Sequence, residues 1–275
     1  MNTLPKNDFA NPQAAGSLRA EPVPLTVRGL SLSFLDKLVL KDIDLDVSAG
    51  QFVAIIGPSG SGKSTLLNVL AGFVGPTSTG VELSGDAKVG TSSPGSGDVR
   101  CGVVFQEYAL FPWRSARKNV EFALEALGVA AAERSSRAMT YLKHVGLDDA
   151  AELHPHQLSG GMKQRVAIAR ALAFEPSVLL MDEPLGAVDA ITREKLMELI
   201  DRVWRNAGTT VVYVTHNISE AVFLADRVIV LKSNPGEIAL DLTIDLPRPR
   251  DQLSMEAIAY ERQLREAIPE MTRGA

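Results

Sequence analysis

A glycine-rich loop between a strand-like and a helix-like segment limits the folds open to this 275-residue chain more than any other feature. The loop reads GPSGSGKS at residues 57–64 and fits the pattern G-x-x-x-x-G-K-[ST]. The apolar run QFVAIIG precedes it, and KSTLLNVLAGF, with apolar residues at helical spacing, follows it. Such a loop wraps backbone N–H groups around phosphates at a helix N-terminus. The sequence therefore predicts a phosphate site held by a strand, a loop and a helix, rather than an ordinary glycine turn.

The side chains of this loop have distinct expected roles. Lys63 is expected to reach the β- and γ-phosphates of a nucleotide, and the Ser64 hydroxyl is expected to ligate Mg²⁺. The residues expected to contact the nucleotide are Gly57, Pro58, Ser59, Gly60, Ser61, Gly62, Lys63, Ser64 and Thr65.

Strand and helix patterns along the rest of the chain predict an α/β fold. LTVRGLSLSF and LVLKDIDLDV predict an antiparallel hairpin around Leu35 and Asp36. Three later strand patterns, SVLLMD, TTVVYVTH and RVIVLK, are separated by helical segments, which favours a mainly parallel sheet. A helical subdomain is expected as an insertion at about 107–174.

Three parts of the chain are expected in all. Residues 1–24 are predicted to be a disordered leader, 25–245 one catalytic domain, and 246–275 a C-terminal tail with a short helix. Ile258, Leu264 and Ile268 are expected among the apolar positions of that tail helix.

Composition excludes several functional classes. The net charge of -5 gives no support to a broad nucleic-acid-binding surface. No apolar stretch approaches the roughly 18 residues of a membrane span. Because Cys101 is the only cysteine, neither an intrachain disulfide nor a cysteine cluster for zinc can form. Any membrane role is therefore expected to need another subunit.

Two adjacent carboxylates end a predicted buried strand in VLLMDEP. The carboxyl ends of strands are where open α/β sheets bind ligands. Asp182 is suited to hold Mg²⁺ through water, and Glu183 is suited to polarise an attacking water molecule. The alternative is a helix N-cap followed by a solvated carboxylate.

Other polar residues also follow strand patterns. His216 ends VVYVTH, where a neutral imidazole could contact a γ-phosphate or could be a packing or capping residue. Gln106 could ligate Mg²⁺ or orient water through its amide oxygen, or it could cap the helical block. Phe111 and Trp113 follow Gln106 and are either the core of the helical subdomain or an exposed docking surface.

Six motifs together make the chain similar to a known family. GPSGSGKST, VFQ, LSGGMKQR, LLMDEP, GAVD and VTH occur in the order and spacing of the ATP-binding subunit of ATP-binding cassette (ABC) transporters. The resemblance covers about residues 25–241. It implies a P-loop NTPase core, with the hairpin region and helical insertion described above, that binds ATP and Mg²⁺.

The resemblance also implies a head-to-tail homodimer with two shared ATP sites. Each ATP would lie between the phosphate loop of one copy and the LSGG element of the other. Ser159, Gly160 and Gly161 would then begin a helix whose positive end faces the partner's γ-phosphate. Without the other motifs, the LSGG element could simply cap its own helix.

Further roles are implied for single residues. Phe34 lies where the family places an aromatic ring that stacks on adenine, although it could be a hairpin core residue. Gln106 resembles the glutamine at the hinge of the helical subdomain, and Asp189 the aspartate of a loop that links the two ATP sites. Val188 and Asn217 depart mildly from the family pattern, and neither departure removes a catalytic group.

Surface segments resemble one branch of the family more narrowly. The FPW after Gln106, DAITREKL, and RVIVLKSNPGEIALDLTIDLPRPRD are similar to segments of the bacterial importers of nitrate, sulfonates and taurine. The resemblance implies an ATPase at the cytoplasmic face of the inner membrane, with permease subunits and, indirectly, a substrate-binding protein outside. The alternatives are a soluble ABC ATPase without a transport role and a P-loop kinase.

Overall fold

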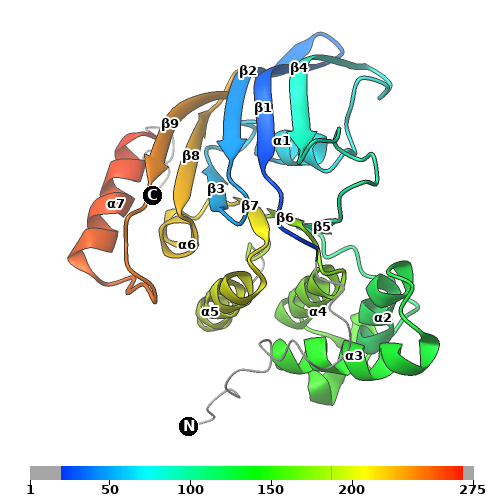
Figure 1. The fold of residues 1–275 in the computed structure, drawn as a ribbon. Coiled ribbons are helices and arrows are strands. Elements are labelled where there is room, and N and C mark those ends of the chain that lie inside the picture. The colour runs from blue at the N-terminus through cyan, green and yellow to red at the C-terminus, as the bar shows by residue number, and fades with distance from the viewer. Residues whose placement is uncertain (1–19, 187, 269–275) are drawn as a thin grey trace.

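Two β-sheets and the helices packed against them make up the fold of residues 20–186 and 188–268, which the computed structural model describes (Figure 1). The strands are β1 (Leu25–Phe34), β2 (Lys37–Val47), β3 (Phe52–Ile56), β4 (Val81–Val89), β5 (Cys101–Val104), β6 (Val178–Asp182), β7 (Thr210–Val214), β8 (Arg227–Lys232) and β9 (Glu237–Thr243). The helices are α1 (Lys63–Leu70), α2 (Ala116–Ala126), α3 (Ala131–His144), η1 (Asp148–Ala150), η2 (Pro155–Gln157), α4 (Gly160–Ala173), α5 (Ala190–Ala207), α6 (Ile218–Leu224) and α7 (Met255–Glu266).

The two sheets differ in strand direction. The smaller sheet is antiparallel, with the order β2-β1-β4, and the larger sheet has the order β5-β6-β7-β3-β8-β9. The strands from β5 to β8 in that order are parallel, and β9 pairs with β8 in the antiparallel sense. In the hairpin, Phe34 pairs with Lys37, so the turn falls at Leu35 and Asp36. The expected α/β fold with an antiparallel hairpin region is confirmed.

The central strand β3 has all five residues buried, as its unbroken apolar run predicted. Because side chains alternate along a strand, Val53 and Ile55 enter the core between the two sheets, and Phe52 enters the core on the other face. Leu66 and Leu67 of α1 pack into the core between the sheets. This packing fixes the start of α1, and with it the glycine-rich loop, at the end of β3.

The helical subdomain is an insertion between β5 and β6. Helices α2, α3 and α4 contact one another and lie together beside the sheet that carries β5 and β6 (Figure 1). Ser115 caps α2 by accepting a hydrogen bond from the N–H of Lys118 at 3.3 Å. Asn119 is buried and donates through its side-chain amide to the carbonyl groups of Phe111 and Arg114. The segment between β5 and α2 is therefore anchored to the first turns of α2.

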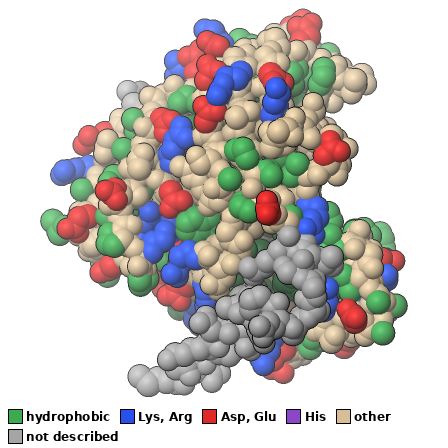
Figure 2. All heavy atoms as spheres, in the orientation of Figure 1, with side chains coloured by type: hydrophobic (Ala, Val, Ile, Leu, Met, Phe, Trp, Pro, Cys, Tyr) green, Lys and Arg blue, Asp and Glu red, His purple; other side chains and the backbone are tan. Residues whose placement is uncertain are grey.

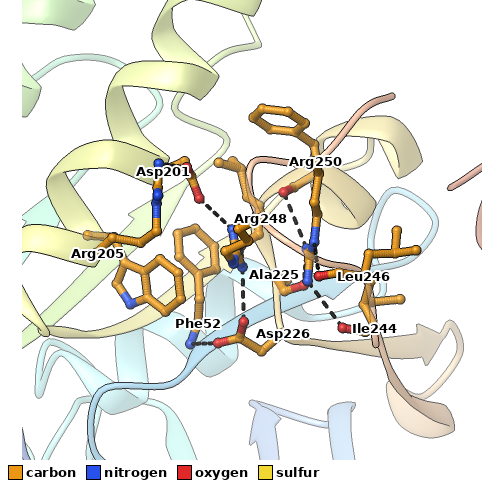
Figure 3. A network of polar contacts seen from close by, with 12 residues as sticks. Phe52, Asp201, Arg205, Ala225, Asp226, Ile244, Leu246, Arg248 and Arg250 are labelled. Atoms are coloured by element: carbon orange, nitrogen blue, oxygen red, sulfur yellow. Dashed lines mark hydrogen bonds and ion pairs between the residues drawn. The ribbon is translucent and has the colours of Figure 1, made fainter. Parts of the chain in front are cut away.

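The C-terminal tail is fastened to the core by two arginines (Figure 3). Arg250 donates to the carbonyl groups of Val222 and Ala225 at 2.8 and 2.6 Å, so it satisfies acceptors at the end of α6. Arg248 donates to the carbonyl of Leu224 at 2.7 Å. Desolvation by burial lowers the pKa of Arg250 to about 10.

The tail helix α7 follows, and two of the three predicted apolar positions at this end of the chain are buried. Ala257, Leu264 and Ile268 are buried, whereas the side chain of Ile258 is 48% exposed. The prediction for Ile258 was wrong because Ala257 lies two helical turns before Leu264, and Ile258 is turned about 100° away from it.

Most of the predicted disordered leader lies outside the described residues, which begin at Ala20. Its last residues depart from the prediction. The Val23 carbonyl accepts a hydrogen bond from the Thr210 hydroxyl at 2.7 Å, and the Pro24 carbonyl accepts one from the N–H of Gly90 at 2.7 Å. These bonds hold Val23 to β7 and Pro24 to the residue that follows β4.

The surface carries charges of both signs. Lys and Arg side chains alternate with Asp and Glu side chains over the face drawn in Figure 2. Within the described ranges, no helix is both long enough and apolar enough to span a bilayer.

Candidate functional site

A cleft of about 660 Å³ opens where the loop after β3 meets the ends of β6 and β7. Carboxyl ends of neighbouring parallel strands lie at one edge of a sheet, which is why residues far apart in the sequence meet here. The described residues that line the cleft are Phe34, Lys37, Leu38, Val39, Ser59, Gly60, Gly62, Lys63, Ser64, Thr65, Gln106, Glu183, His216, Asn234 and Pro235.

Lys63 lies inside the curve of the glycine-rich loop. Its ammonium group donates to the carbonyl groups of Gly57 and Pro58 at 2.9 and 2.8 Å and lies 3.4 Å from the Ser61 hydroxyl. Burial lowers the pKa of this ammonium, and the charges of Glu183 and Asp182 oppose that shift. A cation held by neutral carbonyl groups at the mouth of a cleft is well placed to bind an anion.

The glycines of the loop allow its tight curvature. Gly60 and Gly62 have φ of 78° and 86°, in the left-handed region that favours glycine. A Cβ added to Gly57 would lie 2.3 Å from the Leu231 carbonyl oxygen, and one added to Gly62 would lie 2.6 Å from a methyl group of Leu40. The loop is therefore closely packed against β2 and β8.

Ser64 lines the cleft and contacts Asp182, and the two side chains together are suited to a metal ion. The Ser64 hydroxyl donates to Asp182 Oδ1 at 3.0 Å. Burial raises the pKa of Asp182, whereas the Ser64 hydrogen bond opposes the rise. Two hard oxygen donors beside a phosphate site fit Mg²⁺, which is bound through one or two protein oxygens plus phosphates and water. Across the described part of the chain, no group of three or more His, Cys, Asp or Glu side chains could hold a metal ion.

Glu183 is at the centre of a second polar group. Its Oε2 lies 3.2 Å from His216 Nδ1 and 3.5 Å from Gln106 Nε2. Its backbone has φ of 44°, and its N–H donates to the Val214 carbonyl at 2.9 Å, across from β6 to β7. The structure therefore brings two predicted residues, Gln106 and His216, to one carboxylate oxygen of a third, Glu183.

Phe34 occupies the far wall of the cleft. Its side chain is 39% exposed at the end of β1, so it is not a hairpin core residue. An exposed aromatic face in a cleft offers a stacking surface for a planar base. The neighbouring residues Lys37, Leu38, Val39, Asn234 and Pro235 were not singled out from the sequence. The only sequence signal for them was their position just after the hairpin turn beside Phe34, at the start of β2, or in the turn after β8.

The LSGG element and Asp189 are outside this cleft. Ser159 is exposed and caps α4 by accepting a hydrogen bond from the N–H of Met162 at 3.3 Å, and Gly160 and Gly161 form the first turn of that helix. Asp189 is also exposed and caps α5 through the N–H of Thr192 at 3.0 Å. That hydrogen bond lowers the pKa of Asp189. The single chain does not bring these residues to the phosphate loop.

Phe111 and Trp113 form part of an aromatic cluster on the helical subdomain. The Phe111 ring centroid lies 5.6 Å from that of Trp113 and 4.8 Å from that of Phe122. The Arg114 guanidinium lies over Phe111, 5.3 Å from the ring centroid. Because Trp113 is 71% exposed, this cluster is a surface feature rather than the core of the subdomain.

Comparison with known proteins identifies the family. The model of the ABC transporter family matches residues 40–186. A nitrate import ATP-binding protein of Synechocystis is 47% identical over 227 residues, covering 81% of this chain and 83% of that protein. An aliphatic sulfonates import ATP-binding protein of Rhodopseudomonas palustris is 48% identical over 242 residues, covering 88% and 82%.

A solved structure agrees in fold. A dimeric ATP-binding cassette, in a post-hydrolysis state bound to ADP and phosphate, has a TM-score of 0.70 and 34% sequence identity. The match covers 81% of this chain and 100% of that one. The resemblance drawn from the six motifs is confirmed. The chain belongs to the ABC transporter family as one of its ATP-binding subunits, an ATPase coupled to the transport of a solute across a membrane.

Proposed function

We propose that this chain is the ATP-hydrolysing subunit of a bacterial importer for nitrate, a sulfonate such as taurine, or a similar small solute. The catalytic part of the proposal rests on one observation: the carboxylate of Glu183 lies at the phosphate loop, in contact with both His216 and Gln106. The transport part is supported by the names of the two relatives, which concern nitrate import and aliphatic sulfonates import.

Nucleotide binding would use the two walls of the cleft. The adenine stacks on Phe34, and the phosphates enter the loop of residues 57–65. Lys63 then exchanges its bonds to the Gly57 and Pro58 carbonyl groups for bonds to the phosphates. This exchange is favourable because a charged phosphate is a stronger acceptor than a neutral carbonyl group.

Hydrolysis would depend on Glu183 acting on a water molecule. The carboxylate accepts a hydrogen bond from the water, whose oxygen attacks the γ-phosphorus as the bond to the bridging oxygen of ADP breaks. Ser64, Asp182 and Gln106 would hold Mg²⁺, which neutralises phosphate charge when it is bound. His216 would leave Glu183 and donate a hydrogen bond to the γ-phosphate.

A second copy of the chain would complete each ATP site. Ser159, Gly160 and Gly161 begin a helix outside the cleft, where the unpaired N–H groups of a first helical turn attract an anion. In a head-to-tail homodimer these groups would face the γ-phosphate held by the partner, and Asp189 would lie between the two sites. The dimeric form of the similar cassette supports this assembly.

Transport would need partners that cross the membrane. Permease subunits would hold the ATPase dimer at the cytoplasmic face of the inner membrane, and a substrate-binding protein would deliver the solute from the other side. The aromatic cluster of Phe111, Trp113 and Phe122 follows Gln106, which contacts Glu183. An exposed aromatic cluster so near the proposed base would be a suitable contact for the permease.

The replacement Glu183→Gln tests the catalytic proposal. The variant should hydrolyse ATP at less than about 1% of the wild-type rate, since removal of a positioned base costs on the order of 10²-fold or more. It should still bind ATP and should form ATP-dependent dimers, detected by size-exclusion chromatography. Glu82→Gln, on exposed β4, is the matched control and should keep the wild-type rate. Hydrolysis by Glu183→Gln at the parental rate would exclude Glu183 as the base.

A growth experiment tests the proposed solutes. A strain without this chain should fail to use nitrate as sole nitrogen source, or taurine or an alkanesulfonate as sole sulfur source. Wild-type protein should restore growth, and Glu183→Gln should not. Unimpaired growth of the deletion strain on all of these sources would contradict the assignment to this branch.

A further inference from the structure

Glu220 is a buried carboxylate close to the catalytic group but without an assigned role. It lies on α6, four residues after His216, and its side chain is 4% exposed. One carboxylate oxygen, Oε2, accepts hydrogen bonds from the Tyr213 and Thr215 hydroxyls, both at 2.8 Å. The other oxygen lies 3.4 Å from Arg193 Nε on α5. One oxygen of Glu220 therefore contacts the end of β7 and the turn after it, and the other contacts α5.

The first oxygen fixes the turn that carries His216. Thr215 precedes His216, and its hydroxyl both donates to Glu220 and accepts from the N–H of Asn217 at 3.0 Å. The residues on either side of His216 are thus tied to one another and to α6. His216 itself is half exposed and contacts Glu183, so its direction depends on this turn.

The second oxygen leads to the loop before α5. Arg193 lies in the first turn of α5, and its Nη2 donates to the Val188 carbonyl at 3.0 Å. Val188 immediately precedes Asp189, the exposed residue that caps α5. Glu220 and Arg193 therefore form a direct path between the turn of His216 and the loop of Asp189.

Stability alone is a weak reason for such a pair. Removing a carboxylate and a guanidinium from water costs free energy that their attraction often fails to recover. Burial accordingly raises the pKa of Glu220, and the hydrogen bonds from Tyr213 and Thr215 oppose that rise. An ion pair whose carboxylate is buried at a cost, and which connects two loops of a site, is better explained by the geometry it imposes.

A second buried carboxylate provides an internal comparison (Figure 3). Asp201 of α5 has a 7% exposed side chain and contacts Arg248 and Arg205. Arg248 also contacts Asp226 at 2.9 Å and lies over the Trp204 ring. These contacts fasten the C-terminal tail, and none of these residues lines the ATP cleft. Residues of α5 thus take part in two charged clusters. The cluster of Arg193 and Glu220 joins two loops of the site, and the cluster of Asp201 and Arg248 joins the C-terminal tail to the core.

We propose that Glu220 and Arg193 are a positioning pair that couples the loop of Asp189 to the turn of His216. This inference rests on the proposed function, in which Asp189 lies at the dimer interface and His216 contacts the γ-phosphate. Contact between the partner copy and the Asp189 loop is passed through Arg193 and Glu220 to His216. Hydrolysis at one site then becomes dependent on correct closure of the dimer.

The replacement Glu220→Gln tests the role of the pair. Glutamine has nearly the same shape, and its oxygen can still accept from Tyr213 and Thr215, but it lacks the negative charge that pairs with Arg193. The kcat for ATP hydrolysis should fall at least about fivefold, with KM for ATP changed less than about twofold, because the pair positions groups that act after binding. Asp201→Asn is the matched control: it removes a similar buried charge, and its kcat should remain within about twofold of wild type.

Thermal unfolding of all proteins separates positioning from loss of structure. Both variants should melt below wild type, and kcat is compared at a temperature where each is folded. An unchanged kcat in folded Glu220→Gln would overturn the proposal. An equal fall in kcat for Asp201→Asn would also overturn it, because the effect would then follow from the loss of any buried charge on α5 or α6.

A double-mutant cycle tests the coupling itself. Asp189→Ala and Glu220→Gln are measured alone and together. If they act along one path, the double variant should have a kcat within about twofold of the slower single variant. Multiplication of the two losses would show independent action and would overturn the coupling. Failure of the proposed function is distinguishable, because in that case the wild-type chain itself would show no ATP hydrolysis.

Discussion

The starts of α1 and α4 both contain glycines, yet they are built in opposite ways. Before α1 the backbone curls through positive φ at Gly60 and Gly62, and the buried Lys63 is held by the loop's own carbonyl groups. Before α4 the exposed Ser159 caps the helix in the ordinary manner, and Gly161 is already helical. The first is an enclosed cradle, and the second is an open helix end.

The difference concerns which residues meet within one chain. Beside the loop before α1, Lys63, Ser64 and Glu183 line one cleft, and Ser64 donates to Asp182. The LSGG element has a capped helix end, and its residues do not line that cleft. An element that can attract an anion but lies outside the cleft of its own chain fits the proposed site that two copies of the chain share.

The largest effect is expected from Lys63→Ala. Loss of the only cation inside the loop should lower kcat/KM for ATP by about 10²- to 10³-fold, as removal of a positioned charge donor does. ATPase assays would measure it, with Lys88→Ala on exposed β4 as the control. A Lys63→Ala chain with near-normal activity would show that the loop is not the phosphate site.

Mixed dimers test whether the open helix end completes the partner's site. Lys63→Ala and Ser159→Arg chains should each be inactive alone, because each homodimer carries two damaged sites. A mixed dimer has one site with both lesions and one intact site, so mixing should restore part of the ATPase activity. No recovery, with mixed dimers confirmed by mass spectrometry, would mean that each site lies within a single chain.

Single alanine replacements compare the two glycine positions in the nucleotide-free chain. Gly57→Ala places a Cβ 2.3 Å from the Leu231 carbonyl oxygen, so the free energy of unfolding should fall by about 1–3 kcal/mol. Gly161→Ala meets only ordinary contacts, 3.4 Å from Thr192 Cγ2, and should change that free energy by less than about 0.5 kcal/mol. Urea denaturation of both variants measures the two free energies of unfolding. An equal decrease in both variants would contradict the prediction.

The smallest expected effect concerns the base end of the cleft. Phe34→Ala should raise KM for ATP on the order of fivefold, because stacking of a base on an aromatic ring contributes about 1 kcal/mol or more. Its kcat should change little, since the proposed stacking of Phe34 acts on the base rather than on the phosphates. Phe34→Tyr keeps the ring and should keep the wild-type KM. An unchanged KM in Phe34→Ala would remove Phe34 from the nucleotide site.

Local patterns predicted much of the fold and of the cleft. The turn at Leu35 and Asp36, the buried β3 and the convergence of Asp182, Glu183 and His216 follow from alternation and from strand ends. In these cases the signal lies in adjacent residues, so no knowledge of distant contacts was needed.

Features that depend on long-range packing could not be predicted. Asn234 joins the cleft only because β8 and β9 place their turn beside β2, and Ile258 is exposed only because Ala257 meets the core. The Glu220–Arg193 contact joins two helices whose relative position the sequence pattern leaves open.

The backbone conformation of Glu183 is unfavourable for stability but places a carboxylate in the cleft. A glutamate in the left-handed region, at φ of 44°, costs about 1 kcal/mol or more relative to an ordinary conformation. Glycine would relieve that strain and make the protein more robust, but it would remove the carboxylate beside His216 and Gln106. At this one position the residue that would give the more stable chain is not the residue that supplies the proposed base.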